Sequence, residues 1–145
     1  MLVIANSLDL ILFQFDVASA YLQSPIVEEI YVAQPEGFGV IKREREVYRL
    51  HKCLYRLRQA SPVWSELFDA FLSEFGLTPS ISDPCLYLYQ HGSAILIVAL
   101  WVDDGLAACN TPDLLEKILT HLKTQFFITP RAADLFVGLH ITRNF

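Results

Sequence analysis

The fold of this chain is decided by residues 94–109, which have the sequence AILIVALWVDDGLAAC. Residues 94–102 are the longest apolar run in the chain, and residues 106–109 are a second, shorter run. An apolar run of this length that is interrupted by Asp-Asp-Gly predicts a buried strand, a tight turn and a second strand. The turn would place the adjacent carboxylates of Asp103 and Asp104 at the edge of an apolar sheet.

Two helices are predicted on either side of this stretch. The first begins with Ser61 as N-cap and Pro62 as first helical residue, and Gly76 ends it. The second begins in the same way with Thr111 and Pro112. Each helix has an apolar stripe at helical spacing, which is typical of a helix packed on a sheet. The stripes are Trp64, Leu67, Phe68, Phe71, Leu72 and Phe75 in the first helix, and Leu115, Ile118, Leu119, Leu122 and Phe126 in the second.

Shorter apolar runs predict the remaining strands. These are residues 10–15, ending at Asp16, then 28–33, 47–50, 85–90 and 135–141. The dipeptide His91-Gly92 predicts a hairpin between 85–90 and 94–102. The order strand, helix, two or three strands, helix, strand predicts one α+β domain over residues 1–145, in which an antiparallel sheet carries two helices on one face.

Composition narrows the class of protein. Of 145 residues, 53 % are hydrophobic, which excludes a disordered chain. The net charge of −5 has the wrong sign for a self-sufficient nucleic-acid-binding domain but is compatible with a site for metal cations. Three cysteines without a CxxC pair favour a reducing compartment over a disulfide framework. Because no apolar run reaches the roughly 18 residues of a membrane span, we expect an intracellular protein that is not secreted.

Three aspartates stand apart from the other acidic residues. Asp16 follows an apolar run, and Asp103 and Asp104 interrupt the most apolar stretch of the chain. Adjacent carboxylates repel each other and cost desolvation energy unless a cation neutralises them. If the strand before Asp16 lies beside the hairpin, the carboxylates converge as in a two-metal phosphoryl-transfer site. The alternative is that Asp-Asp-Gly is only a β-turn, because Asp and Gly favour turn dihedrals.

The chain also contains six sequence blocks that resemble, in order, those of the copia-type retrotransposon reverse transcriptase, the RNA-dependent DNA polymerase region of the polyprotein. The blocks are FDVASAYL (15–22), EIYVAQPEGF (29–38), LHKCLYRLRQA (50–60), SDPCLY (82–87), WVDD (101–104) and FVGLHI (136–141). One block would be weak evidence, but six in order span nearly the whole chain.

The resemblance implies a polymerase palm with part of the fingers, while the thumb and RNase H lie outside this chain. It implies that Asp16, Asp103 and Asp104 are catalytic, with two Mg²⁺ (or Mn²⁺) ions held by Asp16 and Asp103 and a weaker contribution from Asp104. It also implies that Tyr21 stacks under the incoming sugar and that Gln59 lines the nucleotide pocket. Without the resemblance, Tyr21 would be interpreted as a core aromatic and Gln59 as a polar residue beside a helix.

The partners implied are an RNA or DNA template–primer, deoxynucleoside triphosphates and the remaining polyprotein domains, in the cytoplasm or in virus-like particles and without a membrane. Seven of the 11 basic residues lie between positions 42 and 58. Lys52, Arg56 and Arg58 are therefore expected to contact nucleic acid, since cationic side chains neutralise phosphates. The alternative is a solvated charged loop, because Glu44 and Glu46 interleave these residues.

Three positions depart from the family pattern: Trp101 replaces a usual Tyr, Arg56 a usual Gly, and Ala18 a usual Lys. If position 56 has a positive φ, Arg would strain it by about 1 kcal/mol or more. Two other functions stay open. A nucleotidyl cyclase would use Asp16 and Asp103 in the same way, but the six glycines do not cluster into a phosphate-binding turn. A non-catalytic module, decayed or repurposed from a transposon, would act by protein interaction.

The palm interpretation makes a geometric prediction. The strand that ends at Asp16 should pair beside the hairpin, so that the carboxyl groups of Asp16 and Asp103 approach each other at a solvent-open edge of the sheet, with Tyr21 near the same cleft. Separation of these carboxyl groups by more than about 12 Å would leave only an inference about ancestry. With fingers and thumb outside the chain, we expect the isolated chain to be inactive as a polymerase.

Overall fold

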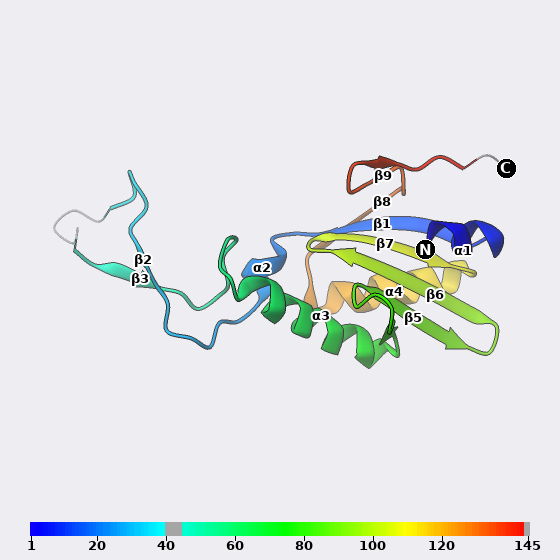
Figure 1. Ribbon diagram of the computed structural model, residues 1–145, viewed down its shortest axis with the longest axis horizontal. Coiled ribbons are helices and arrows are strands. Elements are labelled where there is room, and N and C mark those ends of the chain that lie inside the picture. Colours follow the sequence, from blue (N-terminus) through cyan, green and yellow to red (C-terminus); the bar gives the residue numbers. More distant parts are fainter. Residues whose placement is uncertain (40–44, 144–145) are drawn as a thin grey trace.

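The computed structural model describes residues 1–39 and 45–143. Its centre is a six-stranded sheet with the order β4-β5-β6-β7-β1-β8, in which every neighbouring pair is antiparallel (Figure 1). The strands are β1 (Ile11–Val17), β4 (Thr78–Pro79), β5 (Leu86–His91), β6 (Ala94–Trp101), β7 (Asp104–Cys109) and β8 (Ile128–Arg131). The predicted β6–β7 hairpin is confirmed, with Trp101 opposite Asp104 at its closed end.

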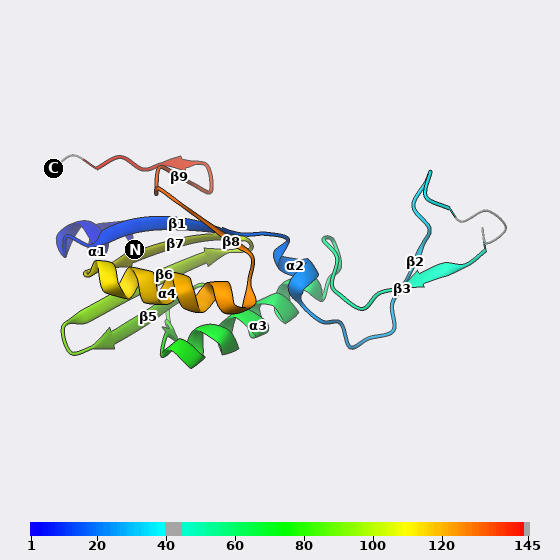
Figure 2. The ribbon, with the colours of Figure 1, turned by 180° about the vertical axis from the view of Figure 1, so that it is seen from behind.

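Two helices pack on one face of this sheet, as predicted. They are α3 (Ala60–Phe75) and α4 (Pro112–Gln125), whose apolar residues share one core with the sheet, and Figure 2 shows α4 in front of the strands. Their apolar stripes meet alternate residues of β1, β6 and β7, because successive side chains of a strand point to opposite faces. Phe15, Trp64 and Phe68 are among the largest side chains in this core and are almost fully buried.

The opposite face carries a second, smaller core that the sequence pattern did not predict. A short helix, α1 (Leu2–Ser7), places Ala5 against Leu10, Ile97 and Ala108. The expectation that helices cover one face only is therefore wrong for the N-terminal residues. The helix has only six residues and its first four, Leu2–Ala5, are all apolar, so no helical period can be detected in the sequence.

The ends of α3 and α4 agree only in part with the three predicted cap residues. Thr111 is the N-cap of α4, and its side chain accepts a hydrogen bond from the Leu114 amide (3.3 Å). Gly76 ends α3 with φ +101°, as predicted. The prediction for Ser61 is wrong: α3 already begins at Ala60 after Gln59, and Pro62 lies within its first turn. Proline is tolerated there because first-turn amides have no helical acceptor to lose.

Residues 25–39 and 45–52 form an arm that extends away from the sheet (Figure 1; Figure 2). It follows a single-turn helix, α2 (Ala20–Gln23), and contains the paired strands β2 (Tyr31–Ala33) and β3 (Val47–Arg49). An isolated bridge between Pro25 and Lys52 closes its base. Most side chains of both strands are exposed, so the arm has little core of its own.

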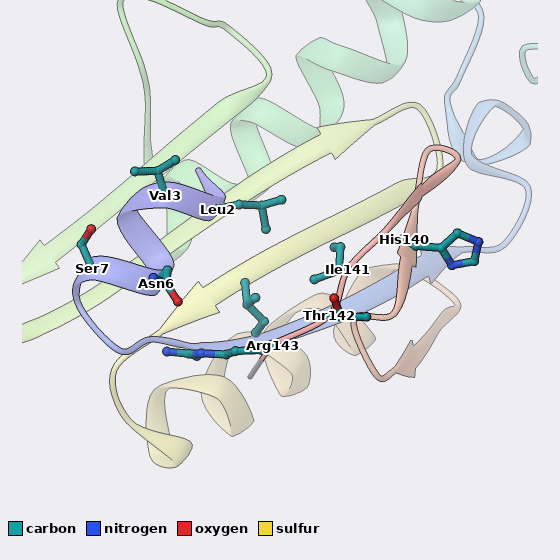
Figure 3. Close-up of a pocket in the computed structure, with 9 residues that line it drawn as sticks. Leu2, Val3, Asn6, Ser7, His140, Ile141, Thr142 and Arg143 are labelled. Carbon is teal, nitrogen blue, oxygen red and sulfur yellow. The ribbon is translucent and has the colours of Figure 1, made fainter. Parts of the chain in front are cut away.

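The C-terminal prediction needs correction. Residues 135–141 are not one strand but a small hairpin, β9 (Leu135–Phe136) and β10 (Leu139–His140), because Val137 and Gly138 both have positive φ. The residues that follow this hairpin line a pocket of about 420 Å³ with α1 and Leu12 (Figure 3). No helix among the described residues has the length and apolarity to cross a membrane.

Candidate active site

The three candidate aspartates lie together at one end of the central strand pair. Asp16 and Asp104 are direct partners across β1 and β7, and the Val17 amide donates to the Asp103 carbonyl (2.8 Å). Directly opposed residues of an antiparallel pair have Cα atoms about 4.5–5.5 Å apart. The predicted pairing of Asp16 beside the hairpin is confirmed, although Asp16 lies inside β1 rather than at its end.

The turn that carries the aspartates has an unusual backbone. Val102 and Asp103 connect β6 to β7, and Val102 has φ +57°, a conformation that β-branched residues rarely adopt. Gly105 follows, against the ring of Phe15. A Cβ added at Gly105 would lie 2.1 Å from that ring, so only glycine fits at this position. The turn is therefore held against the sheet core from its β7 side.

Two tyrosines border Asp103. The Tyr55 hydroxyl donates to Asp103 Oδ2 (3.4 Å), and the Tyr55 ring centroid lies 4.7 Å from that of Tyr21 on α2. Burial raises the pKa of the Tyr55 phenol, and the negative charge of Asp103, its hydrogen bond, Tyr21 and Asp16 raise it further. Tyr21 thus lies near the aspartates as expected. Tyr55 was not among the predicted site residues, since its contact with Asp103 joins distant parts of the chain.

Arg131 is a second residue that the sequence did not predict. Its guanidinium donates to Asp104 Oδ1 (2.9 Å) from β8, the edge strand beside β1. The strand itself was missed because it contains Pro130 and directly follows α4. The ion pair partly neutralises Asp104, whereas neither Asp16 nor Asp103 forms an ion pair with a basic side chain in the described part of the chain.

These side chains do not form a preassembled metal site. Within residues 1–39 and 45–143, no group of three or more His, Cys, Asp or Glu side chains is arranged to hold a metal ion. The predicted convergence is therefore confirmed for the strands but not for the three carboxylates as a group. Their chemistry does fit a divalent cation, because the available donors are carboxylate oxygens, which Mg²⁺ prefers, on neighbouring strands.

Comparison with known proteins identifies the family of the chain. Residues 1–144 match the family described as reverse transcriptase (RNA-dependent DNA polymerase). This chain belongs to the reverse transcriptase family. It is 36 % identical over 143 residues to the retrovirus-related Pol polyprotein from transposon TNT 1-94 of Nicotiana tabacum. It is 33 % identical over 141 residues to that from transposon RE1 of Arabidopsis thaliana.

The chain corresponds to a small part of these relatives. The matches cover 97 % and 90 % of this chain but only 11 % and 10 % of the two plant polyproteins. A putative transposon Ty5-1 protein of Saccharomyces cerevisiae is 30 % identical over 130 residues, which is 89 % of this chain and 42 % of that protein. The chain thus corresponds to a reverse transcriptase region within these longer transposon proteins.

The remaining residues implied by the reverse transcriptase resemblance lie around the base of the arm. Gln59 directly precedes α3 and is partly buried. The Lys52 ammonium donates to the Gln23 carbonyl (3.1 Å). Arg58 is exposed, and Arg56 is exposed with φ +73°, so the strain expected from replacing a family glycine applies. Residues 42–44 of the basic segment lie outside the described residues.

Proposed function

We propose that this chain is the palm, with part of the fingers, of an RNA-directed DNA polymerase that uses two-metal nucleotidyl transfer. The observation that carries the proposal is the register of β1 and β7, which brings Asp16 beside Asp103 and Asp104. Asp16 and Asp103 would hold two Mg²⁺ ions, and Mn²⁺ would also serve. When bound, such ions activate the attacking oxygen and stabilise the leaving oxygen.

Asp104 would contribute less than the other two aspartates. Its ion pair with Arg131 already satisfies part of its charge. Asp16 and Asp103 would turn their carboxylates toward a shared cation, and the Asp103 carboxylate also accepts a hydrogen bond from the Tyr55 hydroxyl. This difference agrees with the weaker role that the resemblance implies for Asp104.

The surrounding residues would bind the substrates. Tyr21 lies next to the aspartates through its contact with Tyr55, where it would stack under the sugar of a deoxynucleoside triphosphate. Gln59 would line the same pocket. Lys52, Arg56 and Arg58 would contact the template–primer backbone, since they lie between the arm and α3.

The isolated 145-residue chain should lack processive polymerase activity. In the matched plant transposons it represents about a tenth of the polyprotein, whose other domains would supply contacts to template and triphosphate. Binding energy from remote contacts positions the reacting atoms. The purified chain should extend a labelled primer on an RNA template by no more than about one or two nucleotides. Longer products would contradict the expected inactivity of the isolated chain.

The metal site can be tested by Mn²⁺ titration of the chain, followed by electron paramagnetic resonance. Asp16→Asn and Asp103→Asn should each weaken binding about tenfold or more, because each removes a charged oxygen ligand. Asp113→Asn is the matched control, because it is an identical change at an exposed position of α4, which follows the end of β7 opposite to Asp104. Equal affinity in all four proteins would refute the two-metal proposal and favour the non-catalytic module.

The nucleic-acid contact can be tested separately. A double variant, Arg56→Ala with Arg58→Ala, should reduce the affinity for a template–primer duplex and flatten its dependence on salt, because fewer phosphate counterions are released. The control is Lys117→Ala with Lys123→Ala, which removes the same charge from exposed positions of α4. An equal loss in both double variants would show that only net charge matters.

A further inference from the structure

The tryptophan at the start of the α3 stripe does more than fill the core. The Trp64 indole Nε1–H donates to the main-chain carbonyl of Val102 (2.7 Å), the residue that precedes Asp103 in the turn. This is a short, direct hydrogen bond between the helix layer and the aspartate turn. Because the acceptor is a backbone oxygen, this hydrogen bond constrains the backbone of the turn and not only a side-chain rotamer.

Val102 needs such a constraint. Its φ of +57° is costly for a β-branched residue, and conformations of this kind persist only when the surroundings over-determine them. Glycine is the usual residue at the first position of a two-residue hairpin turn with positive φ there. The backbone at Val102 would otherwise relax and move Asp103 with it.

Trp64 is a rigid donor. Its side chain is 2 % exposed, and its ring packs 5.2 Å from Phe68 and 5.4 Å, edge to face, from Phe126 of the α4 end. On the other side of the turn, the Val17 amide bonds to the Asp103 carbonyl, and Gly105 packs on Phe15. The turn is thus fixed to the core from two directions.

We propose that Trp64 is a positioning residue that holds the Val102–Asp103 turn in the conformation that binds the divalent cations. The inference rests on the proposed two-metal function and extends it to a residue in the helix layer. The competing explanation is that the bond only satisfies a buried indole N–H, as buried tryptophans commonly require. The two explanations differ in their effect on cation binding.

The test compares Mn²⁺ affinity and thermal midpoint in Trp64→Phe and Phe68→Leu. Trp64→Phe retains an aromatic ring but removes the donor, and it should weaken Mn²⁺ binding roughly tenfold, as is typical when a group that orients a ligand is removed. Phe68→Leu perturbs the same cluster without touching the turn and should bind Mn²⁺ like the unsubstituted chain. Equal affinity in Trp64→Phe and the unsubstituted chain would overturn the proposal.

A glycine at the turn sharpens the result. Val102→Gly accepts the positive φ without strain, so Trp64→Phe should cost clearly less Mn²⁺ affinity in that background. Purely additive losses would contradict the positioning role. If the unsubstituted chain binds no Mn²⁺, the proposed function fails and this inference fails with it. If Mn²⁺ binds with the same affinity with and without the Trp64 indole, only this inference is rejected and the proposed function stands.

A measurement on the unsubstituted chain avoids any folding defect of the variants. If the indole bond favours cation binding, cation binding must favour the bond by the same factor. Saturating Mg²⁺ should therefore slow hydrogen exchange of the Trp64 indole N–H by roughly tenfold. The backbone amide of Asn110, which donates to the Ile95 carbonyl at the other end of the β6–β7 pair, serves as the internal control. Unchanged exchange at Trp64 in the Mg²⁺-bound chain would overturn the proposal.

Discussion

The central sheet and the arm both contain antiparallel strands but, among the described residues, only the central sheet is covered by helices. All apolar residues of β7 and the central residues Leu96, Ile97 and Val98 of β6 are buried, because α3 and α4 supply an apolar layer on one side and α1 covers part of the other. In β2 and β3 no residue is fully buried. Hydrogen bonding between two strands therefore does not bury their side chains. Burial requires a second layer of helices or strands packed on the pair.

This difference matches the proposed division of function. The aspartates lie where the backbone is tied to the core, which suits groups that must hold a fixed geometry. The arm exposes apolar side chains such as Phe38, at 77 %, and its base carries Lys52, which suits contact with a partner. Tyr55, which follows the arm in the chain, contacts Asp103 of the turn and Tyr21 of α2.

The largest expected effect compares the same substitution in the two regions. Phe68→Ala removes a fully buried ring from the core and should lower the free energy of unfolding by about 3–5 kcal/mol. Phe38→Ala in the arm should change it by no more than about 0.5 kcal/mol. Urea denaturation followed by circular dichroism measures both. Similar losses would show that the arm has a core after all.

The second comparison uses glycine. Gly105→Ala forces a methyl group into the Phe15 ring and should cost about 1–3 kcal/mol. Among the described residues, a Cβ at Gly39 of the arm meets only the Gln34 side chain at 3.6 Å, so Gly39→Ala should be nearly neutral. The same denaturation assay applies. A neutral Gly105→Ala would mean that Phe15 can move and that the turn is not fixed from the β7 side.

A substitution near the arm base should increase stability by a smaller amount. Arg56→Gly should raise the free energy of unfolding by about 1 kcal/mol, because glycine accepts φ +73° without steric strain. Arg58→Gly removes the same charge at a residue without positive φ and should be destabilising by up to about 1 kcal/mol. Thermal unfolding at matched ionic strength measures the difference. Equal shifts would indicate that charge, rather than backbone strain, dominates.

The smallest effects concern cysteine reactivity. Cys85 is exposed and should react first with iodoacetamide, followed by Cys53 at the arm base and then Cys109 in the sheet core, since local opening costs less where packing is sparse. Burial, with the charges of Asp83 and Asp69, raises the pKa of Cys85. Its alkylation rate should therefore keep rising with pH after a free thiol is fully ionised. Mass spectrometry of timed samples gives the order of labelling. Labelling of Cys109 before Cys53 would mean that the sheet core opens more readily than the arm base.

Much of the sheet could be predicted because its signals are local. The apolar run 94–102, the turn His91-Gly92 and the Thr111 cap each depend on residues that are neighbours in sequence. The β8 strand could not be predicted in this way, because Pro130 is unfavourable in a strand interior and is tolerated only at an edge. The sequence predicts Ser61 as the cap, whereas Gln59 precedes the helix, because proline fits several first-turn positions and does not mark one of them.

The sequence by itself determined the family, the antiparallel hairpin and the identity of the three candidate aspartates, because blocks, periodicity and turn residues are properties of short segments. Only the tertiary structure decided which groups surround them. Arg131 reaches Asp104, Tyr55 reaches Asp103, and Trp64 reaches the Val102 carbonyl across gaps of 27, 48 and 38 positions in the chain. Such contacts depend on how the helix layer and the edge strand pack against the sheet, and packing is a property of the whole fold.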